Sequence, residues 1–136
     1  MSAAIEQLLP HRPPMRWIDE LVEFTDTTAK ATARLAADHF AAADGAVMET
    51  ALVECVAQTV AAAQGARAKA SGKSGAPTGG MLAAVSGFRV VSRPLCGQAL
   101  HIEVREVKRF GPMMLVAGTV TCDGQLMASG DLTLYA

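Results

Sequence analysis

Residues 47–70 constrain the fold of this chain more than any other stretch. The first four turns of this segment are apolar or small on every face, a pattern typical of a helix that is buried all round. Glu54 interrupts the pattern, and Gln58 follows one turn later on the same face. Because a lone buried carboxylate is costly, either the fold satisfies Glu54 locally or the site keeps it as a proton donor. We favour the second interpretation.

Six other segments have the composition and alternation of β-strands. Two precede the helix, at residues 17–24 and 28–35, and four follow it as an antiparallel run, at residues 81–92, 99–110, 113–122 and 125–135. Residues 81–92 are mostly apolar, which predicts a strand covered on both faces. Asp123-Gly124 between the last two strands is a strong hairpin signal. A short helix is expected at residues 2–9, a rigid turn at 10–15, a loop at 36–46 and a flexible connector at 71–80.

This order of elements predicts an α+β fold in which one antiparallel sheet wraps around one apolar helix. The 136 residues are enough for a single domain, residues 1–136, with a real core. A helix covered by one curled sheet keeps open sides. We therefore expect the chain to form at least a dimer, with sites between subunits.

Composition excludes several classes of function. A net charge of -1 and the lack of a basic cluster argue against nucleic-acid binding. The charged residues within the central helix argue against a membrane span. The three cysteines have no CxxC spacing, so we expect no disulfide, no metal site and no cofactor. Together with the lack of a signal-peptide pattern, this composition predicts a cytoplasmic protein.

Two motifs carry a resemblance to a known family. Residues 9–20, LPHRPPMRWIDE, resemble the LPHRxPFLLVDR segment of the hotdog-fold 3-hydroxyacyl-acyl carrier protein dehydratases, and residues 52–59, LVECVAQT, resemble their IIEAMAQ helix segment. Residues 40–45, ending in ADG, look closer to the ApeP-like aryl-polyene branch. The resemblance spans nearly the whole chain and implies the hotdog fold.

The resemblance also implies site residues. Glu54 matches the family's general acid on the helix. The family's catalytic histidine lies in a GHFPG segment before the helix. The matching pair here is His39-Phe40, fifteen residues ahead of Glu54, without the flanking glycines and prolines. The family's proline-glycine at the helix start is replaced by Met48-Glu49.

His39 is either this base or an ordinary loop histidine, and other residues of the site also remain open between two roles. His11, in the 10–15 turn, is a second candidate for the base, and its alternative role is to fix that turn by hydrogen bonding. Gln58 either orients Glu54 or a water, or satisfies a buried polar pair. The expected substrate contacts are Gln58, Val47, Met48 and Phe40. The N–H groups at the start of the helix could face a thioester oxygen.

These groups suit dehydration of a 3-hydroxyacyl thioester, which needs a base, an acid and donors to an enolate-like oxygen. A neutral histidine can be the base near neutral pH. A carboxyl group can be the acid if burial raises its pKa. The resemblance implies an acidic acyl carrier protein, bearing a phosphopantetheine-linked substrate, as partner. The basic residues that could form a docking rim, or simply a solvated surface, are Arg89, Arg93, Lys108 and Arg109.

Two alternatives stay open beside a dehydratase that makes trans-2-enoyl groups in fatty-acid or polyene-type biosynthesis. A hotdog thioesterase would use the same carboxylate to activate water and would release a free acid. A non-catalytic hotdog subunit would pair with an active dehydratase, and the missing glycines and prolines around His39 favour it. The expected assembly is a homodimer, a higher oligomer or a heterodimer with another hotdog dehydratase.

Overall fold

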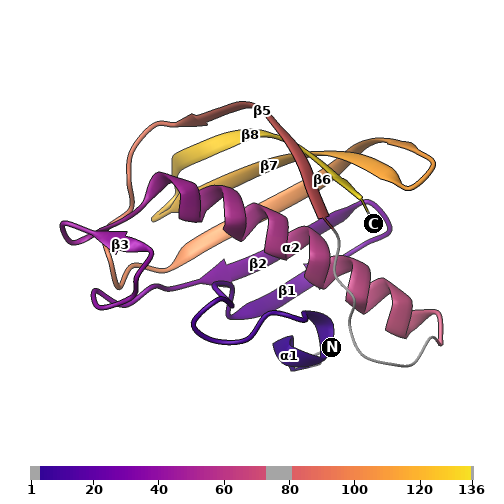
Figure 1. Cartoon of the computed structure of the whole chain (residues 1–136), viewed down its shortest axis with the longest axis horizontal. Coiled ribbons are helices and arrows are strands. Elements are labelled where there is room, and N and C mark those ends of the chain that lie inside the picture. Colours follow the sequence, from indigo (N-terminus) through magenta and orange to yellow (C-terminus); the bar gives the residue numbers. More distant parts are fainter. Residues whose placement is uncertain (1–3, 73–80, 136) are drawn as a thin grey trace.

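A computed structural model describes residues 4–72 and 81–135, and its central element is the long helix α2 (Glu49–Ala70). The helix runs across one face of a six-stranded sheet, and the short helix α1 (Ile5–Leu8) packs beside it (Figure 1). This is the predicted α+β arrangement and the hotdog fold. Of the predicted connector 71–80, all but its first two residues lie outside the described residues.

All six predicted strands are present, and every neighbouring pair in the sheet is antiparallel. The sheet order is β1-β2-β6-β7-β8-β5. The strands are β1 (Glu20–Phe24), β2 (Thr28–Ala33), β5 (Met81–Val90), β6 (Leu100–Phe110), β7 (Met113–Cys122) and β8 (Gln125–Tyr135). The expected run of four consecutive strands is wrong in one respect, because β5 pairs with β8 at the edge instead of with β6.

The predicted loop at residues 36–46 contains a small hairpin that the sequence analysis missed. Strands β3 (Ala42–Ala43) and β4 (Ala46–Val47) pair across Asp44-Gly45, whose φ angles are 56° and 77°. Positive φ at both central residues is the geometry of a two-residue hairpin turn, and Asp-Gly is the sequence that favours it. Because Val47 belongs to this hairpin, the helix begins at Glu49 and not at residue 47.

The middle of α2 is buried all round, as predicted. Every residue from Cys55 to Ala63 is buried. Small residues let the helix lie close to the sheet, since a Cβ atom added at Gly118 of β7 would fall 2.5 Å from a methyl carbon of Val56. Within the described ranges, no helix is both long and apolar enough to cross a membrane.

The prediction that residues 81–92 are covered on both faces is wrong for the single chain. Met81 is 68% exposed and Val85 is 45% exposed, although both are apolar. The physical reason is that β5 lies at the edge of the sheet and α2, which covers the middle strands, makes few contacts with it. A ten-residue apolar edge is a template for pairing with another chain.

The contact between α1 and α2 gives a stability prediction with an unusual sign. A glycine-to-alanine change inside a helix normally stabilises it by about 1 kcal/mol. A Cβ atom at Gly65 would lie 2.5 Å from the carbonyl oxygen of Leu8. We therefore expect Gly65→Ala to lower the free energy of unfolding by about 1–3 kcal/mol in urea denaturation. The exposed Lys69→Ala in the same helix is the control, with a change within about 0.5 kcal/mol. A stabilised Gly65→Ala would show that α1 does not lie against the helix.

Candidate functional site

The buried amide of Gln58 ties the N-terminal strap, residues 10–18, to α2. Its Oε1 atom accepts hydrogen bonds from the backbone N–H groups of Trp17 (2.8 Å) and Ile18 (3.3 Å). Its Nε2 atom donates to the carbonyl oxygen of Met15 (2.7 Å) and to Oε2 of Glu54 (3.3 Å). The side chain is 1% exposed, and these four bonds use the whole capacity of the amide. Its contacts fit both predicted roles, since one bond holds Glu54 and the other three satisfy backbone groups of the strap.

The strap brings His11 to Glu54. His11 Nε2 lies 3.7 Å from Glu54 Oε2, and the other ring nitrogen, Nδ1, is buried without a hydrogen-bond partner among the described residues. The turn itself is fixed by Arg12, whose guanidinium donates to the carbonyl oxygens of Glu6, Leu9 and His11. The alternative role predicted for His11, fixing the turn, is thus performed by its neighbour.

The expectation that Glu54 lies in a dry site is wrong for the single chain. The side chains of His11 and Glu54 are 31% and 32% exposed. The strap covers only one side of the carboxylate, and the open flank that a single curled sheet leaves beside its helix is the physical reason. A bound substrate or a second subunit has to cover the pair before water is excluded from it.

Both ring nitrogens of His39 have hydrogen-bond partners in the single chain. Its Nδ1 atom accepts a hydrogen bond from the N–H of Ala41 (3.0 Å), which places the ring proton on Nε2, 3.1 Å from the carbonyl oxygen of Pro14. The ring stacks on Phe40 and meets Trp17 edge-on, at 4.8 Å and 5.8 Å between centroids. In this arrangement both nitrogens are occupied, so His39 holds the loop against the strap.

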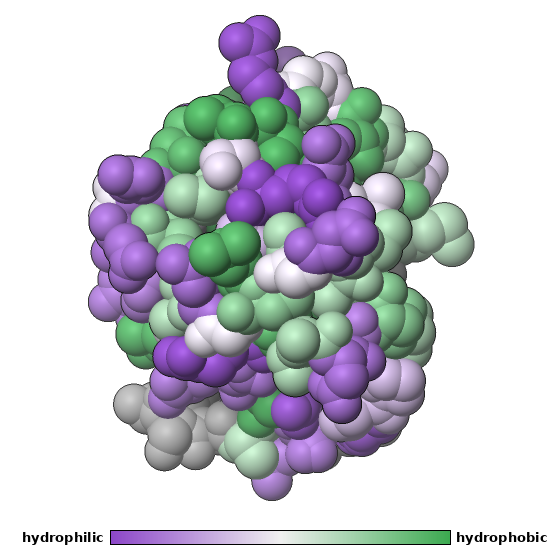
Figure 2. Space-filling view, turned by 90° about the vertical axis from the view of Figure 1, so that its left-hand side faces the viewer, coloured by the Kyte–Doolittle hydropathy of each residue, from purple (hydrophilic) through white to green (hydrophobic). Residues whose placement is uncertain are grey.

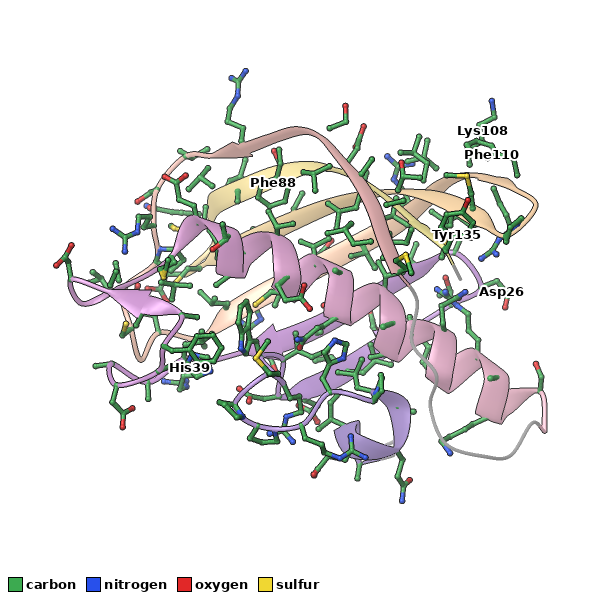
Figure 3. All side chains as sticks on the ribbon, viewed as in Figure 1. Asp26, His39, Phe88, Lys108, Phe110 and Tyr135 are labelled. Atoms are coloured by element: carbon green, nitrogen blue, oxygen red, sulfur yellow. The ribbon has the colours of Figure 1, made fainter. Side chains whose placement is uncertain are left out.

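His39 lies at the β3 end of the molecule, at the opposite end from Lys108, Phe110 and Tyr135 (Figure 3). Hydrophobic and hydrophilic residues alternate over the surface at the β3 end (Figure 2). Two of the predicted substrate contacts, Phe40 and Met48, are 55% and 38% exposed. They supply apolar surface near the start of α2.

The predicted N–H donors at Val47 and Met48 are already used. The N–H of Val47 donates to the carbonyl oxygen of Pro94, and that of Met48 donates to the carbonyl oxygen of Ala41, both at 2.8 Å. Met48 is the N-cap residue, and no side chain caps the helix. Donors to a substrate oxygen would therefore have to come from the first turn of α2, which begins at Glu49.

Cys55 and His101 lie where the sequence predicted, one in the core and the other on the surface. Cys55 is fully buried, and desolvation raises the pKa of its thiol to about 12, so it is a packing residue. His101 is exposed on β6. The described part of the chain contains no group of three or more His, Cys, Asp or Glu residues that could hold a metal ion.

A family model and a solved complex match this chain over nearly its whole length. The model of a family described as ApeP-like, ApeP dehydratase, matches residues 3–136. No curated protein matches the sequence. Among solved structures, the dehydratase heterocomplex ApeI:P from Xenorhabdus doucetiae superposes with a TM-score of 0.88 at 19% identity, covering 99% of this chain and 91% of that chain.

Two further structures are similar in fold. The PaaI protein of the phenylacetic acid degradation operon of E. coli has a TM-score of 0.67 at 8% identity, covering 85% of this chain and 81% of that chain. A hypothetical thioesterase from Streptococcus pneumoniae, solved with coenzyme A, has a TM-score of 0.64 at 12% identity, covering 85% and 86%. At such identities these likenesses concern the fold.

The Gln58 amide generates a prediction about stability. Gln58→Leu keeps the volume but leaves the N–H groups of Trp17 and Ile18 and the carbonyl of Met15 without this partner. We expect the free energy of unfolding to fall by about 3 kcal/mol or more, measured by urea denaturation. Gln64→Leu, which removes only one contact to Arg67, should change it by less than about 1 kcal/mol. Equal losses in the two variants would show that the strap is not held by Gln58.

Proposed function

The chain belongs to the ApeP-like dehydratase family, and from this premise we propose that it converts (3R)-3-hydroxyacyl thioesters on acyl carrier protein into trans-2-enoyl thioesters. The family match over residues 3–136 supports the reaction class. The carrier-bound substrate and the setting in fatty-acid or polyene-type biosynthesis are part of the proposal. No cofactor is required, because the elimination needs only proton transfer and charge stabilisation.

The contact between His11 and Glu54 carries the proposal. Dehydration breaks a C–H bond at one carbon and a C–O bond at the next, so its base and acid must reach neighbouring atoms, each from about 3 Å. Two proton-transfer groups 3.7 Å apart meet that demand. Neutral His11 would take the proton next to the carbonyl. The Glu54 carboxyl would protonate the departing hydroxyl, which leaves as water, and Gln58 would hold the Glu54 oxygen in place.

Stabilisation of the thioester oxygen is assigned to the start of α2. The first N–H groups of a helix lack intrahelical partners and carry its positive end. No side chain caps this helix, and the N–H of Ala51 donates to the carbonyl oxygen of Met48, so the N–H groups of Glu49 and Thr50 are the donors we assign. Phe40 and Met48 would supply apolar contact to the substrate arm nearby.

A second hotdog subunit is part of the proposal. The partly exposed Glu54 and the apolar edge strand β5 both indicate surface that a partner covers in the assembled protein. The partner is either a second copy of this chain or another hotdog dehydratase. The similarity to the dehydratase heterocomplex ApeI:P supports the second arrangement.

A non-catalytic partner role is the second candidate function. It is favoured by one observation: His39, which the resemblance makes the base, has both ring nitrogens occupied. A thioesterase reaction at the same site would release a free acid, so the product distinguishes it from dehydration.

We expect Glu54→Gln to fold normally and to lose turnover by about 100-fold or more, because an amide cannot supply the proton. The assay follows a 3-hydroxyacyl carrier protein by mass spectrometry, in which loss of water marks the enoyl product and release of free acid marks hydrolysis. His11→Gln should lose activity to a similar extent, whereas the exposed His101→Gln should keep it. His39→Gln should lower the melting temperature of the protein, since it breaks the hydrogen bonds to Ala41 and Pro14.

The histidine variants also decide between the two bases. If His39→Gln abolished turnover at an unchanged melting temperature while His11→Gln stayed active, the base would be His39. Full activity of Glu54→Gln would remove the acid role. A wild-type chain that is inactive alone but restores or enhances the activity of a co-purified hotdog dehydratase would favour the non-catalytic role.

The apolar edge gives a prediction about assembly. Val85→Lys places a charge on β5, where we expect it to shift the protein from dimer to monomer in analytical ultracentrifugation. The control is Val107→Lys, a valine of similar exposure (48%) on β6, inside the sheet. This control should remain dimeric. A dimer that survives Val85→Lys but not Val107→Lys would place the interface elsewhere.

A further inference from the structure

The side chain of Arg93 is bonded to the backbone of the β3–β4 hairpin. Its guanidinium donates from Nε to the carbonyl oxygen of Val47 (3.0 Å) and from Nη2 to those of Ala43 (2.7 Å) and Ala46 (3.2 Å). The side chain is half-buried. All three carbonyls belong to the β3–β4 hairpin, 46 to 50 residues earlier in the sequence. One side chain thus holds both strands of the hairpin.

The backbone beside Arg93 holds the same hairpin. The carbonyl oxygen of Pro94 accepts from the N–H of Val47 (2.8 Å), and the N–H of Cys96 donates to the carbonyl oxygen of Gly45 (2.9 Å). Two-residue strands are too short to keep their place without such support. Residues 93–96 therefore decide where the hairpin lies.

The hairpin in turn is joined to the site at both ends. Downstream, Val47 leads directly into Met48, the N-cap of α2. Upstream, the N–H of Met48 donates to the carbonyl oxygen of Ala41, and His39 holds the loop to the strap through Pro14. A shift of the hairpin would move the first turn of α2 and the strap that carries His11.

We propose that Arg93 is a positioning residue of this site, which fixes the start of α2 and the His39 loop through three backbone carbonyls. The proposal rests on the proposed function for its effect on turnover. The planar guanidinium reaches the three carbonyls from two nitrogens, whereas the single ammonium of a lysine is a compact point charge that cannot span them. Arg93→Lys is therefore not a conservative change here.

Turnover of a 3-hydroxyacyl carrier protein gives the first test. We expect Arg93→Lys to lower kcat by about tenfold or more with KM changed by less than about threefold, because a displacement of about 1 Å can cost that much rate. Arg93→Ala should behave likewise, and millimolar guanidinium chloride, far below unfolding concentrations, should restore part of its kcat. Arg105→Lys, an exposed arginine on β6, is the matched control and should turn over normally.

A second readout works without any activity. Trp17 is the only tryptophan, and its ring centroid lies 5.8 Å from those of both His39 and Phe40. We expect a shifted Trp17 emission in Arg93→Lys, and faster amide hydrogen exchange at residues 42–48 with unchanged protection in β6, β7 and β8. If the wild type shows no turnover, the proposed function fails, and these two measurements still decide the role of Arg93.

Two results would overturn the proposal. One is an Arg93→Lys protein with the kcat, Trp17 emission and hydrogen exchange of the wild type. The other is exchange that quickens equally in all elements while kcat per folded molecule stays unchanged, which is the behaviour of a residue that serves general stability only. Should Arg93→Ala fail to fold, the Arg93→Lys protein alone decides between these outcomes.

Discussion

The arrangement of the site depends on one buried side-chain amide. Gln58 uses two donors and two acceptors to bind the strap and the Glu54 carboxylate at once. A buried amide without partners would cost about 1–3 kcal/mol for each unsatisfied group, so the strap has a single favourable position on α2. That position brings the imidazole of His11 beside the helix carboxylate. The hydrogen bonds of Gln58 thereby fix the relative position of the strap and α2, two segments more than forty residues apart in sequence.

The single chain exposes what an assembly would bury. Glu54 is one-third exposed and the apolar strand β5 forms an open edge, although the sequence of both regions is that of an interior. A six-stranded sheet can cover one side of a helix and leaves the flanks free. The apolar residues at such a flank favour the proposed second subunit, and a carboxylate at the same place gains a dry environment only when that flank is covered.

Hydrogen bonding distinguishes the two candidate histidines within the single chain. His39 is the residue that the family resemblance matches to the base, and its ring accepts a hydrogen bond from the N–H of Ala41 and donates one to the carbonyl oxygen of Pro14. His11 is not matched to the base, yet its Nε2 faces Glu54. The number of residues between two positions fixes their distance in space only when both lie in one helix or strand. His11 lies in the strap and Glu54 lies in α2, so their separation in sequence does not fix their distance. A general base needs a free lone pair, which is a property of the folded environment.

The sequence alone determined the buried helix, the six strands and the pairing of Glu54 with Gln58, because helical and strand periodicities are local properties of the chain. The hotdog fold was implied by the family resemblance of residues 9–20 and 52–59. Asp44-Gly45 also carries the sequence signal for the β3–β4 hairpin, although a loop was predicted at residues 36–46. Only the tertiary structure decided that β5 lies at the sheet edge, that His11 reaches Glu54 and that Arg93 holds the start of α2. These features depend on contacts between segments distant in sequence, whose geometry is fixed by the packing of all elements together.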